Sequence, residues 1–165
     1  MNITFPELAL VLLVGPSASG KTTFAKKHFL ATEVLSSDHF RAIVCDNAFD
    51  QSASTEAFEI LHAVIEKRLK RGLLTVVDAT NLQAIDREGL RKLAKKFHIF
   101  AVLIVFDLDE AICQERNRLR GAQSIPPSVV HSQHLQMKKS LRRLDKERFR
   151  YVFTLRHEAD VEAVT

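Results

Sequence analysis

The segment Gly15-Pro-Ser-Ala-Ser-Gly20-Lys21-Thr22 decides the fold of this chain. It matches the pattern G-x-x-x-x-G-K-[ST], in which glycines let the backbone wrap closely around phosphate groups and backbone amides point at them. The continuous apolar run Leu8–Val14 precedes the loop, as expected of a strand buried on both faces. The helical segment Thr22–Phe29 follows it. Strand, loop and helix in this order predict a P-loop nucleotide site.

ATP and Mg²⁺ are the ligands that this loop predicts. Lys21 is expected to reach the β- and γ-phosphates, and Thr22 is expected to offer its hydroxyl to the metal ion. Ala18 stands where such loops often carry glycine. The other residues expected to line ATP are Gly15, Ser17, Ala18, Ser19, Gly20 and Thr23.

The rest of the chain alternates strand-like segments with helical ones. Further strands are expected at Glu33–Leu35, Leu73–Asp78, Ile99–Phe106 and Arg150–Leu155. Helices are expected at Thr55–Arg71, Arg87–Phe97, Glu110–Leu119 and Pro127–Lys146. This alternation predicts an α/β fold, a P-loop-type parallel sheet with helices on both faces and a helical lid. Ligands of such sheets bind at the carboxyl ends of the strands.

Length and composition predict one globular domain over residues 1–165, with 46% apolar and 27% charged residues. The longest apolar runs are too short to span a bilayer, and the N-terminus lacks the pattern of a secretory signal. Cys45 and Cys113 lie far apart and are expected to be reduced thiols. A cytoplasmic protein with no membrane partner is therefore expected.

Positive charge is concentrated in one stretch of the chain. Met137–Arg150 contains seven basic and two acidic side chains, a net charge of +5, whereas the whole chain carries +4. A local basic stretch on a nearly neutral body suits a polyanionic partner such as nucleic acid. The alternative is a solvated helix face.

Asp38 and Arg41 follow the second expected strand and stand three residues apart, so one helical turn would place them on the same face. We expect Asp38 to orient an attacking hydroxyl and take its proton, since phosphoryl transfer needs mainly positioning and charge stabilisation. Arg41 would hold a phosphate of the acceptor with its fork of donors. The alternative is an N-cap aspartate beside a surface arginine.

A polar group, Asp78, Thr80 and Asn81, ends the third expected strand. Asp78 is expected to support the water shell of the metal or the loop. Thr80 and Asn81 are expected to touch the acceptor. The alternative is a polar cap between a strand and a helix.

Three arginines on one expected helix differ in helical phase. At about 100° per residue, Arg116 and Arg120 lie about 40° apart, and Arg116 flanks an apolar stripe of Ile112 and Leu119. Arg116 and Arg120 are therefore predicted to face the donor phosphates from a lid, and Arg118 to point into solvent. An arginine so placed stabilises a transferring phosphoryl group. The alternative is a solvated basic helix.

The ordered combination of these motifs resembles the kinase module of bacterial Pnkp, a family of RNA-repair polynucleotide kinase-phosphatases. The likeness runs over essentially the whole chain. The motifs that carry it are Gly15–Thr22, Ser36-Ser37-Asp38 with Arg41, Asp78-Ala-Thr-Asn81, Cys113-Gln-Glu-Arg116-Asn with Arg120, Gln136-Met-Lys-Lys-Ser140 and Phe149-Arg-Tyr-Val152.

The resemblance implies a P-loop phosphotransferase that uses ATP and Mg²⁺ to phosphorylate the 5′-hydroxyl ends of RNA or DNA. It implies Asp38 as general base and Arg41 as a contact to the acceptor's phosphate. Lys21 and Arg116 would act on the transferring phosphate, with Thr22 on the metal. Arg120 would belong to the lid. Phosphatase and ligase-like modules would be linked covalently in a longer parent chain.

Two other functions stay open. A P-loop kinase for a small metabolite would share the donor site, but it would need neither the basic stretch nor Arg41. A non-catalytic module that binds nucleotide or RNA would not need Asp38.

Overall fold

A computed structural model describes residues 2–164 and contains a five-stranded sheet in the order β2-β3-β1-β4-β5. The strands are β1 (Ala9–Val14), β2 (Val34–Ser36), β3 (Thr75–Asp78), β4 (Phe100–Phe106) and β5 (Tyr151–Leu155). All neighbouring strands run parallel. β1 lies at the centre of the sheet and is buried at every position, which explains why its sequence is uninterruptedly apolar. The predicted α/β fold is confirmed.

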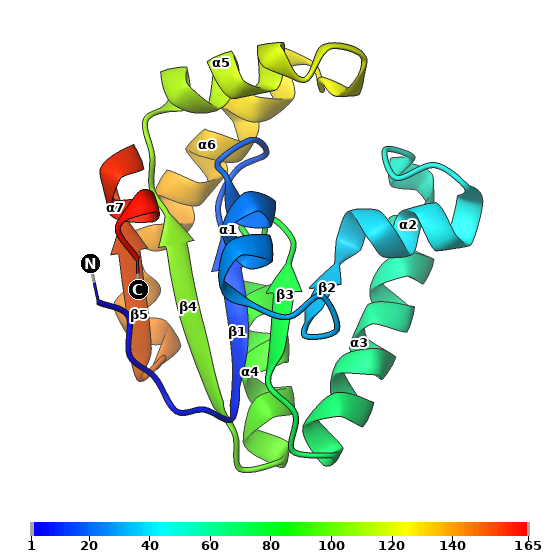
Figure 1. Ribbon diagram of the computed structural model, residues 1–165, viewed down its shortest axis with the longest axis vertical. Helices are drawn as coiled ribbons and strands as arrows, with labels where there is room; N and C mark the ends of the chain where they lie inside the picture. The colour runs from blue at the N-terminus through cyan, green and yellow to red at the C-terminus, as the bar shows by residue number, and fades with distance from the viewer. Residues whose placement is uncertain (1, 165) are drawn as a thin grey trace.

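Helices connect the strands and cover both faces of the sheet (Figure 1). They are α1 (Lys21–His28), α2 (Ser37–Cys45), α3 (Ser54–Lys70), α4 (Ala84–Lys96), α5 (Glu110–Leu119), α6 (Pro127–Leu141) and α7 (Glu158–Glu162). Short 3₁₀ turns are η1 (Gln51–Ala53), η2 (Gly121–Gln123) and η3 (Leu144–Glu147). Figure 1 shows α5 across the carboxyl ends of the strands, above the loop between β1 and α1. None of the helices within residues 2–164 is long and apolar enough to cross a membrane.

Two apolar layers hold the sheet between its helices. On one face, Leu10 and Leu12 of β1 belong to a buried cluster with Leu61 of α3 and Leu90 of α4. On the other face, alternate residues of the same strand pack with α1 and, at the edge, with α7. Successive strand residues point to opposite faces, so one apolar strand supplies both layers.

Arg87 of α4 is fully buried and joins four segments of the chain. Its Nη1 donates to the carbonyl oxygens of Asn81 and Leu82, at 2.9 and 2.8 Å. Its Nη2 donates to Ser140 Oγ of α6 at 2.7 Å, and its Nε donates to Glu147 Oε2 of η3 at 2.8 Å. A buried guanidinium is tolerated only when it is paired in this way. Arg87 therefore ties the end of β3 to α6 and to the approach of β5.

Most predicted element boundaries agree with the structure to within about three residues. One predicted boundary was wrong: α6 ends at Leu141 instead of Lys146, because the chain tightens into η3 and packs Leu144 against the apolar core. α2 and α7 were not predicted. The buried residues of α2 are Ser37, Phe40 and Arg41, so polar side chains occupy part of its inner face.

Candidate functional site

The loop Gly15–Gly20 joins β1 to α1 at the carboxyl edge of the sheet (Figure 1). The Gly15 amide donates to the Thr80 carbonyl at 3.0 Å, and the Ser17 amide donates to Gln133 Oε1 of α6 at 2.7 Å. A Cβ atom on Gly15 would lie 2.8 Å from Ser19 Oγ and 3.0 Å from Phe106 Cβ, so a larger residue there would have to displace its neighbours. The loop is thus fastened to β3 on one side and to α6 on the other.

Ala18 adopts a left-handed conformation, with φ of 62°. This conformation explains why glycine is frequent at the corresponding position of such loops, since a Cβ atom there costs roughly 1–2 kcal/mol. The strain falls at a site that the fold dedicates to a ligand, where strained backbone tends to gather.

Lys21, the first residue of α1, is buried beneath the loop, where its ammonium group bonds oxygens of the loop itself. Nζ donates to the Gly15 and Pro16 carbonyls at 3.0 and 2.8 Å, and to Ser19 Oγ at 3.4 Å. Burial lowers the pKa of Lys21 to about 8, although the nearby Asp78 carboxylate acts in the opposite direction. Phosphate groups entering the loop would stabilise the charged form.

This lowered pKa leads to a prediction for ATP capture. In the free protein Lys21 loses its proton as the pH rises through about 8, so kcat/KM for ATP should fall about tenfold per pH unit above that value. At saturating ATP the phosphates raise the pKa of Lys21, so kcat should hold to a higher pH. Steady-state kinetics from about pH 7 to about pH 10 measure both profiles. The Lys21→Arg variant is the control. The guanidinium of arginine stays charged over this pH range, so the affinity of this variant for ATP should not change with pH. A flat kcat/KM profile for the unaltered protein would contradict the prediction.

Thr22 and Asp78 provide two oxygen donors side by side below the loop. Thr22 Oγ1 donates to Asp78 Oδ2 at 2.7 Å. Burial raises the pKa of Asp78, against the hydrogen bond from Thr22 and the charge of Lys21, which lower it. Hydroxyl and carboxylate oxygens are the ligands Mg²⁺ uses when waters and phosphates complete its shell. These residues therefore fit the magnesium ion expected from the sequence.

Asp38 and Arg41 form an ion pair on the first turn of α2. The Asp38 side chain is 61% exposed and the Arg41 side chain 9% exposed. The Arg41 Nε donates to the Ala48 carbonyl at 2.9 Å, which fixes the guanidinium from behind. The structure thus places both residues on one face, as expected. Asp38 is not the N-cap of the helix, because the Ser36 hydroxyl caps it. Arg41 is not a surface arginine, because it is buried.

The start of α2 lies next to the donor loop because β2 pairs with β3. Ser36 is the register partner of Asp78. The carboxylate of Asp38 is close enough to act electrostatically on both Lys21 and Asp78. The structure therefore brings together the donor and acceptor residues proposed from the sequence, although they come from three separate strand ends.

Asn81, which the sequence predicts to touch the acceptor, is nearly buried in the structure. Asn81 is 5% exposed, and its Nδ2 donates to the Leu13 carbonyl of β1 at 2.7 Å. It fastens the end of β3 to β1. Thr80 remains partly exposed next to it, with its carbonyl engaged by Gly15.

The buried face of α5 differs from the predicted stripe. Leu119 is 69% exposed, whereas Cys113 and Asn117 are buried. Asn117 bonds both the carbonyl and the amide of Ile125, at 2.7 and 3.0 Å, and so closes the turn that leads to α6. The apolar pattern alone therefore predicted the wrong buried face of α5, because the polar side chain of Asn117 lies on the inner face of this helix.

The three arginines nevertheless point as expected. Arg116 Nη1 donates to the Ser19 carbonyl of the loop at 3.2 Å, and Nη2 pairs with Glu158 Oε1 of α7 at 2.7 Å. Arg118 is 70% exposed and pairs with its neighbour Glu115. Only Arg116 of these two reaches the phosphate loop.

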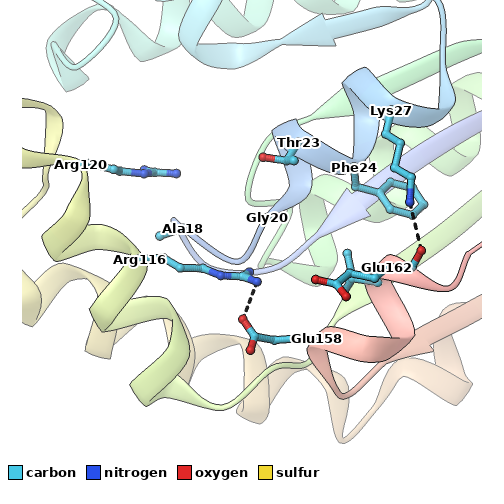
Figure 2. Close-up of a pocket in the computed structure, with 10 residues that line it drawn as sticks. Ala18, Gly20, Thr23, Phe24, Lys27, Arg116, Arg120, Glu158 and Glu162 are labelled. Carbon is cyan, nitrogen blue, oxygen red and sulfur yellow. Dashed lines mark hydrogen bonds and ion pairs between the residues drawn. The ribbon is translucent and has the colours of Figure 1, made fainter.

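A cavity of about 400 Å³ opens between the loop, α1, α5 and α7, and Figure 2 shows Arg116 and Arg120 entering it from the lid. Thr23 and Phe24 form its opposite wall. The residues of α7 that line it were not predicted, since a short, strongly polar helix gives no sequence signal. The lining residues are Ala18, Gly20, Thr23, Phe24, Lys27, Arg116, Arg120, Glu158, Val161 and Glu162.

Comparison with known proteins shows the family of the chain. The model of the AAA_33 family, an AAA domain, matches residues 10–144. No curated protein matches the chain.

Solved structures share the fold at low sequence identity. The chain is 24% identical to a chain of the Pnkp1/Rnl/Hen1 RNA repair complex, with a TM-score of 0.72. The match covers 85% of this chain and 47% of that chain. Kti12 of Chaetomium thermophilum, solved with ADP-AlF3, is 16% identical, with 93% of each chain covered and a TM-score of 0.71. A gluconokinase from Sinorhizobium meliloti 1021 is 17% identical, with a TM-score of 0.60 and coverage of 92% of this chain and 84% of that chain. The chain belongs to the AAA_33 family of AAA domains and has the fold and the phosphate loop of a P-loop kinase.

Proposed function

We propose that this protein transfers the γ-phosphate of ATP to the 5′-hydroxyl end of an RNA or DNA strand, in the healing of broken ends. The observation that carries the proposal is the ion pair of Asp38 and Arg41 beside Lys21 and Asp78. A carboxylate and an anchored guanidinium next to a phosphate loop are the groups that a hydroxyl acceptor bearing a phosphate requires.

In this mechanism Asp38 accepts the proton of the 5′-hydroxyl as its oxygen bonds to the γ-phosphorus. The bond between that phosphorus and the bridging oxygen breaks, and ADP leaves. Lys21 and Arg116 hold the charge that develops on the transferring group. Thr22 and Asp78 would hold Mg²⁺, which neutralises phosphate charge when bound. Glu158 releases Arg116 as the phosphates take its place.

The strand as acceptor is supported by the sequence resemblance, by Arg41 and by the likeness to a chain of an RNA repair complex. The chain spans about half the length of that relative. In the proposed parent protein, phosphatase and ligase-like modules are linked covalently to this kinase domain.

Phosphorylation of a small metabolite is the second candidate. The likeness to a gluconokinase, over 84% of that chain, favours it. Label transfer from γ-labelled ATP to a 5′-hydroxyl oligonucleotide, with a panel of sugars and nucleosides beside it, separates the two. Label that reaches only a member of the metabolite panel would overturn the proposed function.

A prediction follows from the way Arg41 is held. Nε bonds Ala48 and Nη2 pairs with Asp38, while no hydrogen bond of Nη1 is seen within residues 2–164. This nitrogen is expected to bind the phosphate that follows the reacting nucleoside. A nucleoside 3′-phosphate should therefore be phosphorylated far more efficiently than the bare nucleoside, by roughly tenfold or more for one charge-assisted hydrogen bond.

Steady-state kinetics on both acceptors measure this preference. Arg41→Ala should remove most of it, and Arg41→Lys should restore part, because a point charge lacks the rigid fork. Equal efficiency on the bare nucleoside would remove this role from Arg41 and favour the metabolite kinase.

A further inference from the structure

A second cavity, of about 330 Å³, lies at the end of the sheet opposite the phosphate loop. It opens beside the amino ends of β4 and β5, which Figure 1 places far from α5. Arg91 and Lys95 line it from α4, and Arg148 and Arg150 from the segment before β5; Phe100 and His98 also line it. None of the described residues that line it is acidic. We refer to it as the basic pocket.

The cations of the basic pocket have few partners of their own. Within residues 2–164, ion pairs occur at the neighbouring Lys92 and Lys96 but not at Arg91, Lys95, Arg148 or Arg150. The Nε of Arg91 is buried without a hydrogen-bond partner among these residues. Like charges gathered around a hollow repel one another, so an anion that enters would relieve the repulsion.

Aromatic rings distinguish this pocket from a simple anion site. The Arg150 guanidinium lies over the Phe100 ring at 5.1 Å and near the Tyr151 ring at 5.8 Å. Phe100 remains 40% exposed, although it begins a strand that is otherwise buried. A ring and a guanidinium plane next to unpaired cations suit a nucleotide, whose base stacks while its phosphate pairs.

The basic stretch noted in the sequence connects the two ends of the molecule. α6 starts near the phosphate loop, where Gln133 holds Ser17, and runs for about 22 Å, as its 15 residues require. Its second half and the turn after it expose Lys139, Arg142 and Arg143. The basic pocket lies where this stretch ends. The charge is therefore not only a solvated helix face, because it leads from the candidate active site to a cavity.

We propose that the basic pocket binds one nucleotide of a single-stranded nucleic acid, so that the protein grips a strand at a second site remote from the phosphate loop. This inference rests on the proposed function at one point, because it takes the bound strand to be the acceptor of the phosphate. The strand's phosphate would pair with Arg148 and Arg150, and a base would stack on Phe100.

Fluorescence anisotropy of a single-stranded oligonucleotide, labelled at its 3′ end, tests the site in the full chain. The double variant Arg148→Glu with Arg150→Glu should weaken binding at least tenfold and flatten the dependence of log K on log salt by roughly 0.7, the value for the one phosphate that the pocket no longer neutralises. The matched control is Lys70→Glu with Arg71→Glu, two exposed cations at the end of α3, outside the pocket. It should change affinity by less than about twofold. Equal reductions in affinity in both double variants would overturn the proposal.

A variant of the ring separates a nucleotide from any other polyanion. Phe100→Ala should weaken oligonucleotide binding about tenfold, the scale of one base stacked on an aromatic ring, and leave inorganic polyphosphate binding unchanged. Phe100→Leu keeps apolar volume without the planar ring, and serves if the alanine variant does not fold. Binding of polyphosphate as tight as that of the oligonucleotide, with no effect of either variant, would leave only a general anion patch and overturn the proposal.

Kinetics distinguish failure of this inference from failure of the proposed function. The Arg148→Glu, Arg150→Glu variant should phosphorylate a nucleoside 3′-phosphate normally and show about a tenfold higher KM for a long strand. An unchanged KM for the strand would refute the pocket while leaving the kinase intact. Pocket-dependent binding without phosphorylation of any strand would refute the kinase while supporting the pocket.

Discussion

Asp38→Ala is expected to lower turnover by a factor on the order of 10² or more while ATP still binds. Asp38 stands on the proposed acceptor side, exposed and paired with Arg41, and within residues 2–164 no hydrogen bond joins it to the phosphate loop. Loss of its carboxylate removes both the orientation of the hydroxyl and the proton acceptor. Because phosphoryl transfer depends mainly on positioning, the effect should appear in kcat with little change in ATP affinity.

A matched control exists at the other end of the same helix. Asp46 is also exposed, and it occupies the left-handed position after α2, with φ of 57°, which asparagine tolerates well. Asp46→Asn should leave turnover unchanged, whereas Asp38→Asn should lower it nearly as much as Asp38→Ala. ATP binding by calorimetry and the thermal midpoint complete the comparison. Near-normal turnover of Asp38→Asn would remove the residue from the mechanism.

Arg116→Ala should lower turnover by roughly 10² to 10³, the scale for one donor aimed at developing charge. Arg116 reaches over the loop to the Ser19 carbonyl and pairs with Glu158, at the place where the terminal phosphates of ATP are expected. These two partners keep the guanidinium charge partly satisfied and poised at the loop. Arg116→Lys should recover part of the rate but not all, since lysine offers a point charge.

Arg118→Ala is the control, because it lies on the same helix and also pairs with a glutamate. Its side chain is 70% exposed, and removal of a surface pair of this kind changes little. Single-turnover rates at saturating ATP measure both variants. Similar reductions in rate at the two positions would show that the lid closes in another orientation and would withdraw the assignment.

The sequence by itself determined those parts of this protein whose functional residues are neighbours in the chain. A phosphate loop needs its glycines, lysine and threonine within one short segment, so Gly15–Thr22 could be recognised before any packing was known. The buried central strand and the difference in direction between Arg116 and Arg118 also follow from local periodicity. These features depend on neighbours in the chain.

Tertiary structure alone decided which polar side chains serve the fold and which face the site. Asn81 looks like Thr80 in the sequence, but parallel pairing turns its amide toward β1 and buries it. Arg87 gives no local signal, yet it binds Glu147 across sixty positions of the chain. Leu119 fits an apolar stripe, but Asn117 takes the inner face because Ile125 offers backbone partners there.

The same reason applies to the two cavities. α7 contributes Glu158 to the first, and α4 and the segment before β5 meet only in the folded chain to form the second. Arg148 and Arg150 of the second cavity belong to the stretch of net charge +5, but charge along a chain does not show whether it lines a hollow or faces open water. Contacts between residues distant in sequence depend on packing of the whole core, and no local pattern encodes them.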